Sequence, residues 1–518
     1  MADVADVADG GAAVRRPAVP TLVGAAVITQ RPDDVASPGG GDDTLGLMVR
    51  AVRAAADDAC GDGADAARLL GAVEWIGVPE GTWPVPDPAR LVAERIGATG
   101  ARTCRAGVGV LQQDVIARAC AAIVAGELDV ALVVGGEAKA RAQAARRAGV
   151  DATEAAQAAD VVPDEPWQPS DLGVADLEII RNSIAPVTSF ALIESALRAA
   201  AGRSPAEHRA HLGRLWSGFA AVAADLDWAW DRSAPSAEGI VTPSPENRVV
   251  ADPYTRLLAS QWNVDQAAAL VLCSSAAADR FGIDPSRRVH PHASVVSNHS
   301  VPPPARADLA GSPGAALAAE RVLDLTAGGL GVGAVASVDL YSCFPAAVQL
   351  YAAALGLPLD DPRRLTVTGG MTFAGGPLNN YVLGAMAELA RRLRAAPGTV
   401  GLSTSVSGSF VKQGLGTWST DAPERPFVHA DLSAEVAGVD VARPLVDAVA
   451  DGTVVACTVT PDPVTRAVAR VVAVVEGPAG ERTVGAVVDE DVAAWAMADE
   501  PVGAPAAVDA DGTLSFRA

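Results

Sequence analysis

The chain has 518 residues, of which 50% are hydrophobic and 20% are charged, so its composition is that of a soluble globular protein with two or three domains. Its net charge of -22 would repel nucleic-acid phosphates, and no long basic run offsets that repulsion. No uncharged apolar run reaches the ~18 residues that a membrane-spanning helix needs. Nucleic-acid binding and membrane insertion are therefore excluded.

The N-terminal residues, 1–17, predict a flexible tail, because they start as an acidic and Gly-rich run. They lack the basic start and apolar core of a signal peptide. The six cysteines are scattered and form no Cys-x-x-Cys pair, which is typical of reduced, buried thiols. We therefore expect a cytoplasmic protein.

Strand-like and helix-like runs alternate through residues 18–288, which indicates an α/β half-domain. Between about 139 and 250 the pattern loosens into mixed proline, tryptophan and charge, and this predicts an inserted loop domain. The predicted strands are Thr21–Thr29, Leu69–Gly77, Val130–Val134 and Gln266–Cys273, and the predicted helices are Thr44–Asp58, Val110–Ala125, Ser189–Ala201 and Pro205–Ala224.

A second α/β half is predicted at residues 289–420, ending in the strand Val400–Ser405. Its other elements are the helices Ala315–Thr326, Pro345–Ala354 and Asn380–Ala395 and the strand Ala334–Leu340. Residues 425–518 contain short Val-rich runs separated by Pro and Gly turns, which predicts an antiparallel β-domain of about five strands. An OB-like barrel fits this pattern, but the segment is acidic and poor in aromatic residues, which argues against nucleic-acid binding.

Five sequence blocks resemble thiolases, and they occur in the thiolase order. The first combines Ile123-Val124-Ala125-Gly126-Glu127-Leu128-Asp129 with Gly135-Gly136-Glu137, and the others are 266–272, 337–344, 368–377 and 402–413. Together with Pro243 to Arg248 and the run ending at Tyr381, they resemble actinobacterial thiolase-like proteins of the acetyl-CoA acetyltransferase type that carry an extra C-terminal domain.

The resemblance implies a thiolase fold, in which two βαβαβαββ halves form a five-layered αβαβα core, here with a small C-terminal β-barrel-like domain. It also implies a coenzyme A thioester as the ligand, with no permanently bound cofactor. The chain would act as a monomer or a homodimer. His290, His292 and His299 have no cysteine or acidic partner at ligand spacing, so no metal site is predicted.

The positions of the thiolase catalytic residues are all changed in this chain. The nucleophilic cysteine maps to Gly109, which has no side chain to acylate, and the activating histidine maps to Gly376. Tyr341 replaces the Asn or His of the third block, and Ser405 replaces the second catalytic cysteine. Serine without a partner is a poor base. Acyl transfer of the thiolase type is therefore not expected.

Backbone amides survive such replacements. A thioester oxygen could still bind to the backbone amides of two segments, Gly109-Val110-Leu111 and Ser407-Gly408-Ser409. The alternative is that these glycines only form tight turns. Asn379 and Asn380 are further candidates to line the pocket. Weak catalytic candidates are Tyr341, Cys104 and His299. Cys104 can equally be a packed hydrophobic residue, and Cys343 is expected to be structural. Arg248, Arg256 and Lys412 are candidates to meet CoA phosphates.

Three functions fit these observations. The first is a protein that binds acyl-CoA thioesters without thiolase chemistry. The second is a retro-aldol lyase acting on a CoA ester through Tyr341, and the third is a non-catalytic scaffold. Tyr341 in a cleft beside a second proton donor would favour the lyase, whereas a filled cleft would favour the scaffold.

Overall fold

The computed structural model describes residues 18–61, 63–326, 328–462 and 465–517. The predicted tail at residues 1–17 lies outside these ranges. A six-stranded mixed sheet in the order β1-β8-β4-β2-β3-β5 forms the first half. Its strands are β1 (Pro20–Thr29), β2 (Trp75–Pro79), β3 (Arg102–Ala106), β4 (Val130–Ala138), β5 (Glu165–Trp167) and β8 (Asp265–Ser274). β4 and β8 are buried along their whole length, which explains their continuous apolar sequences.

A five-stranded sheet in the order β10-β11-β12-β9-β13 forms the second half. Its strands are β9 (His290–Ser297), β10 (Val335–Asp339), β11 (Val400–Ser407), β12 (Lys412–Ser419) and β13 (Val428–Asp431). The pairing of β13 with β9 carries this sheet past residue 420, the predicted end of the second half.

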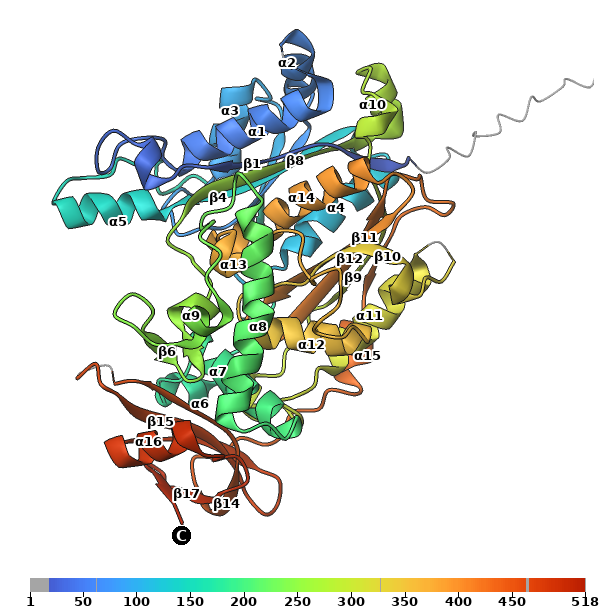
Figure 1. Ribbon diagram of the computed structural model, residues 1–518. Coiled ribbons are helices and arrows are strands. Elements are labelled where there is room, and N and C mark those ends of the chain that lie inside the picture. Colours follow the sequence, from blue (N-terminus) through green and yellow to red (C-terminus); the bar gives the residue numbers. More distant parts are fainter. Residues whose placement is uncertain (1–17, 62, 327, 463–464, 518) are drawn as a thin grey trace, which may run out of the picture.

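Two central helices, α4 (Gln112–Val124) and α14 (Tyr381–Ala395), lie between the two sheets and contact both (Figure 1). The outer face of the first sheet is covered by α1 (Thr44–Cys60), α2 (Ala64–Gly71), α3 (Pro88–Ile96) and α10 (Ser275–Arg280). The outer face of the second is covered by α11 (Pro313–Leu325) and α12 (Pro345–Leu355). The layers therefore run αβαβα, which confirms the predicted thiolase fold.

The segment between β4 and β8, where a loop domain was predicted at about 139–250, consists largely of helices. Its elements are α5 (Lys139–Ala148), α6 (Asp176–Ile180), α7 (Pro186–Ala200), α8 (Pro205–Ala224), α9 (Ala237–Val241), β6 (Val249–Ala251) and β7 (Tyr254–Thr255). α8 begins with a capping box, in which Ser204 and Glu207 bind each other's backbone amides and Pro205 takes the first helical position.

The C-terminal segment forms a third, antiparallel sheet, in the order β16-β15-β14-β17-β18, which packs against α7 (Figure 1). Its elements are β14 (Val449–Pro461), β15 (Val468–Glu476), β16 (Arg482–Val488), α16 (Glu490–Ala498), β17 (Pro505–Val508) and β18 (Leu514–Phe516). A single bridge between Ala486 and Thr513 brings the two edges of this sheet together. The predicted extra β-domain is thus present.

Short elements complete the chain. They are α13 (Gly370–Phe373), α15 (Ser433–Ala437), and the 3-10 turns η1 (Pro32–Asp34), η2 (Arg256–Leu258), η3 (Pro285–Arg287), η4 (Pro303–Ala305), η5 (Val332–Ala334) and η6 (Leu378–Asn380). Within the described residues, no helix is both long enough and apolar enough to span a bilayer.

Two predicted elements were wrong. The apolar run Leu69–Gly77 is not one strand, because Leu69 and Leu70 belong to α2, where they fill its buried face, and the strand starts only at Trp75. The strand Val400–Ser405 is not the last of its half, since β12 follows it as an antiparallel neighbour. Gly414 and Gly416 hide β12 in the sequence, because glycine is rare in strands.

Candidate functional site

Gly109, to which the resemblance assigned the thiolase nucleophile position, lies in the turn between β3 and α4. Its φ of +109° is one that residues with a side chain rarely adopt. A Cβ atom at this position would lie 2.8 Å from Pro169 Cγ and 3.0 Å from Leu172 Cδ2. The position is therefore covered by neighbouring side chains as well as lacking its own.

The residues that cover Gly109 form an irregular segment between β5 and α6, at 168–173, which we call the covering segment. Most of its side chains face solvent, and Leu172 is 59% exposed. Beneath it lies Lys412, which is only 1% exposed. Lys412 Nζ donates to the carbonyl of Asp171 at 2.7 Å and to that of Gly109 at 3.4 Å. The lysine thus joins the covering segment to Gly109, although the sequence made it a candidate to meet CoA phosphates.

The candidate amides lie in two tight turns. α4 begins at Gln112 with Leu111 as its N-cap, and the N–H of Val110 donates to the carbonyl of Gly107 at 3.0 Å. Gly408 has a φ of +61° in the turn from β11 to β12, after Ser407 ends β11. A Cβ atom on Gly408 would lie 2.7 Å from Val411 Cγ2. Both glycines therefore have a turn-forming role, whatever their amides bind.

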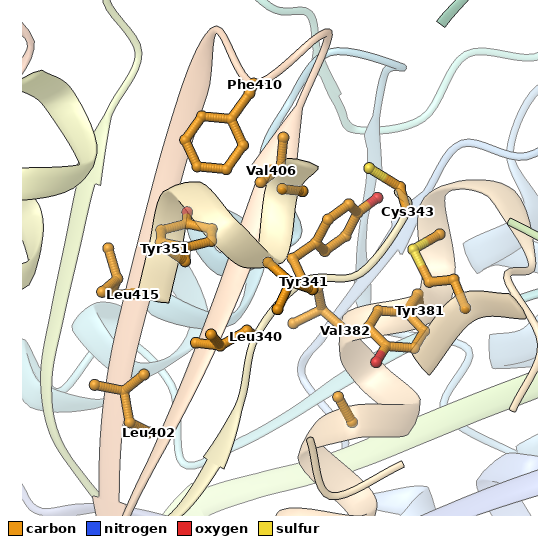
Figure 2. Close-up of a cluster of buried hydrophobic side chains, with 14 of the residues drawn as sticks. Leu340, Tyr341, Cys343, Tyr351, Tyr381, Val382, Leu402, Val406, Phe410 and Leu415 are labelled. Atoms are coloured by element: carbon orange, nitrogen blue, oxygen red, sulfur yellow. The ribbon is translucent and has the colours of Figure 1, made fainter. Parts of the chain in front are cut away.

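Tyr341 packs among apolar side chains (Figure 2). It is 8% exposed, and its ring meets Tyr381 edge-on at 5.7 Å between centroids. Burial raises the pKa of the Tyr341 phenol above its ordinary value. The Tyr381 hydroxyl is held by Thr368 Oγ1 at 2.7 Å and by Asp339 Oδ2 at 3.0 Å. Neither phenol is thus set up as an exposed proton donor.

The remaining family positions are also buried. Gly376 donates its N–H to the carbonyl of Gln261 at 2.9 Å, and a Cβ atom there would lie 3.1 Å from Met371 Cε. Ser405 lies on β11, and its Oγ has no protein partner among the described residues. A histidine at 376 would need Met371 to move.

The structure brings some predicted residues together and separates others. Asn379, in the 3-10 turn η6, accepts from Gln112 Nε2 at 3.4 Å, so it lies at the N-terminus of α4. Asn380 Oδ1 lies against Gly135 on β4. Cys104 is fully buried in β3, and burial raises the pKa of its thiol to about 12. His299 contacts the carbonyl of Asp440 at 3.1 Å. Neither Cys104 nor His299 is placed to activate a ligand at Gly109.

A cavity of about 230 Å³ lies beside the Gly376 turn, and we call it the Arg256 cavity. The backbone of Gln261 connects the two, since it accepts from Gly376 and donates to Met371. The lining residues are Trp230, Asp231, Arg232, Arg256, Leu257, Gln261 and Thr372. Arg256 was a predicted phosphate partner. Trp230, Arg232 and Gln261 were missed, because no motif distinguishes them from the chain's other residues of these types.

Metal chemistry finds no support among the described residues, since no three histidine, cysteine or acidic side chains gather in a way that suits a metal ion. The cavity is instead lined by groups suited to an organic anion: two guanidinium groups, an indole and an amide. The carboxylate of Asp231 and the hydroxyl of Thr372 complete the polar lining.

Replacing Gly109 by alanine should destabilise the chain more than replacing Gly126 by alanine. Gly126 also has a positive φ, of +71°, but a Cβ atom there meets nothing within 4 Å. Both variants strain the backbone, and only Gly109→Ala also overpacks Pro169 and Leu172, at a cost of ~1–3 kcal/mol. Urea unfolding of both variants tests this. Equal shifts in midpoint would show that the covering segment yields freely.

No protein-family model and no curated protein sequence matches the chain. Among solved structures, the monomeric SCP2-thiolase like protein type 1 from Mycobacterium smegmatis is similar over 97% of this chain and 99% of its own, with 26% identity and a TM-score of 0.79. This match spans the C-terminal β-domain as well as the core.

Two more distant structures share the core. The human mitochondrial 3-ketoacyl-CoA thiolase, in complex with CoA, is 15% identical over 78% of this chain and 98% of its own, with a TM-score of 0.53. The Ltp2-ChsH2(DUF35) aldolase is 16% identical over 79% and 99%, with a TM-score of 0.57. These two show the fold alone. With the layered core, the motif blocks in thiolase order and the nearly full-length match, the chain belongs to the thiolase superfamily.

Proposed function

We propose that this chain binds a coenzyme A thioester and does not carry out thiolysis or Claisen condensation through the thiolase residues. The observation that carries the proposal is the Arg256 cavity, which places two arginines and a tryptophan next to the turn that holds Gly376. In a chain of net charge -22, a polyanionic ligand needs such a local group of cations.

The chemistry of the cavity matches the parts of CoA. Among the described residues, the Arg256 guanidinium makes one long bond, from its Nη1 to the carbonyl of Glu246 at 3.3 Å. Arg232 donates from its Nε to the carbonyl of Ala224 at 3.2 Å and pairs with the highly exposed Asp227. Exposed pairs of this kind are weak, so both guanidinium groups are available to phosphates. The half-buried Trp230 offers a face on which an adenine can stack. The thioester arm would then point towards Gln261 and the Gly376 turn.

The same geometry argues against the lyase. A retro-aldol reaction through Tyr341 requires its phenol to reach a ligand, and here the ring is packed beside Tyr381. The likeness to the aldolase shows the fold and adds no catalytic residue. The covered Gly109 likewise supports a protein without acyl transfer. We also propose, as the sequence leads us to expect, that the chain is cytoplasmic and acts as a monomer or a homodimer.

Acetyl-CoA or a longer acyl-CoA should raise the melting temperature in a dose-dependent way. At about a hundred times the dissociation constant, a ligand stabilises the folded state by ~2.7 kcal/mol. Arg256→Ala should weaken the response, because it removes a phosphate partner from the cavity. Arg248→Ala is the matched control, since Arg248 is exposed and lies outside the lining of this cavity. If a panel of CoA esters at millimolar concentration neither raises the melting temperature nor gives a binding signal in calorimetry, the scaffold is favoured instead.

A further inference from the structure

Lysine is rare in this chain, with only Lys139 and Lys412 among 40 basic residues. Arginine serves as the cation almost everywhere else. The two residues differ chemically, because a lysine can lose its proton when buried and then act as a nucleophile, whereas a guanidinium stays charged. A lysine kept at an interior position in such a chain therefore points to the chemistry of its amine.

Lys412 begins β12 and is almost completely buried. Both of its hydrogen-bond acceptors are neutral carbonyl oxygens, and within the described ranges no carboxylate forms an ion pair with it. Burial lowers the pKa of its amine, and the carboxylates of Asp171 and Asp114 offset this only in part. An amine in this setting gives up its proton more readily than one in water.

The position of the amine coincides with the family's reactive centre. Lys412 Nζ lies 3.4 Å from the carbonyl of Gly109, the residue that replaces the thiolase nucleophile. The amine is bonded to the covering segment at Asp171, and Ser170, Asp171 and Leu172 of this segment are exposed. That segment belongs to no helix or strand, so its displacement breaks no regular structure. One residue layer thus separates the amine from a ligand at Gly109.

Asp114 supplies a nearby group that can exchange a proton. It lies in the first turn of α4 and lines a cavity of about 530 Å³ with Asn298 and His429. Burial raises the pKa of its carboxyl to about 7. A carboxyl with this pKa can both accept and donate a proton near neutrality.

We propose that Lys412 is a reactive amine that forms a Schiff base with a ketone or aldehyde carbonyl of the ligand. The lone pair of the neutral amine forms a C–N bond, and the carbonyl π electrons pass to oxygen. The nitrogen gives up its two protons and the oxygen takes up two, so that the C–O bond breaks, water leaves and the C=N bond forms. The choice of a 3-ketoacyl thioester as ligand rests on the proposed function above. The reactivity of the amine itself does not depend on that choice.

The test is reductive trapping on the full chain, with acetoacetyl-CoA and cyanoborohydride at neutral pH. Hydride reduces the imine to a stable secondary amine, which adds the mass of the ligand less one oxygen atom. A Lys139→Arg chain leaves Lys412 as the only lysine, and peptide mapping separates it from the N-terminal amine. We expect the adduct on Lys412, its retention in Lys139→Arg and its complete loss in Lys412→Arg, which keeps the positive charge.

Formaldehyde in place of acetoacetyl-CoA separates this proposal from the proposed function. Modification of Lys412 by formaldehyde, with no melting response to any CoA ester, would uphold the amine and remove the CoA ligand. A melting response to CoA esters with no adduct at Lys412 from either probe would overturn the Schiff-base proposal and keep thioester binding. Both results can be read on the unsubstituted chain, so they do not depend on whether Lys412→Arg folds.

Discussion

Given acetoacetyl-CoA and free CoA, the chain is expected to release no acetyl-CoA above the rate of the mixture without protein. Thiolysis requires a thiolate that is acylated and a base that activates it, and the resemblance assigns both positions to glycines, Gly109 and Gly376. The nearest thiol in sequence, Cys104, is fully buried in β3, and the raised pKa of its thiol keeps it protonated.

The measurement is the loss of acetoacetyl-CoA, which is monitored by chromatography. The protein concentration must be high enough to detect a rate far below the ~1–10³ per second of ordinary enzymes. The matched control is Cys104→Ala, which should change nothing. The assignment of Gly109 and Gly376 would be contradicted by thiolysis at an ordinary enzymatic rate, if this activity co-purifies with the chain and a contaminating thiolase has been excluded.

Replacing Glu194 by alanine should cost the most stability of any change considered. Glu194 on α7 is fully buried, and its carboxylate contacts His208 Nε2 at 2.8 Å and accepts from the Tyr254 hydroxyl and Gln349 Nε2 at 2.6 Å each. Removal of the carboxylate leaves these buried polar groups without their partner. Breaking a buried charged network of this kind costs ~3–5 kcal/mol. Denaturant unfolding of the variant measures the loss.

The pH dependence gives a second readout for Glu194. Burial alone would raise the pKa of this carboxyl, but the hydrogen bonds from His208, Tyr254 and Gln349 lower it below its ordinary value. The carboxylate therefore stabilises the fold above the ordinary glutamate pKa, and this stabilisation is lost as the pH falls below it. Glu194→Ala should weaken that acid sensitivity. Glu320→Ala, at an exposed position on α11, should shift unfolding by no more than ~0.5 kcal/mol, and an equal effect of both variants would refute the role of the network.

The sequence predicted the layered core because its strands carry an unambiguous signal. β4 and β8 are apolar at nearly every position, which only a strand covered on both faces requires. The same reasoning failed at Leu69, because a short apolar run fits a buried helix face equally well. The assignment of Gly109 and Gly376 to catalytic positions rests on the motif blocks and stays a prediction.

The surroundings of the site could not be predicted in the same way. Pro169 and Leu172 contact Gly109, although they come after β4 in the sequence. They belong to an irregular segment, which has no periodic sequence pattern. Lys412 was a candidate to meet CoA phosphates, and nothing in its sequence surroundings marked it as buried, because lysine is usually exposed. Its burial follows from the close approach of Gly408 and Val411 to the covering segment, which is a tertiary contact with no local signal.

The three-residue strand β5 has a consequence for how copies of this chain can meet. It pairs in parallel with β3 at the edge of the first sheet, and Glu165 anchors it by accepting from Arg118 and Arg102. The outer amides and carbonyls of β3 at Cys104 to Ala106 therefore already have neighbours. Edge strands with free backbone groups invite a second chain to extend the sheet. Here, a second molecule could pair with β3 only after β5 had dissociated from it and the ion pairs of Glu165 had broken.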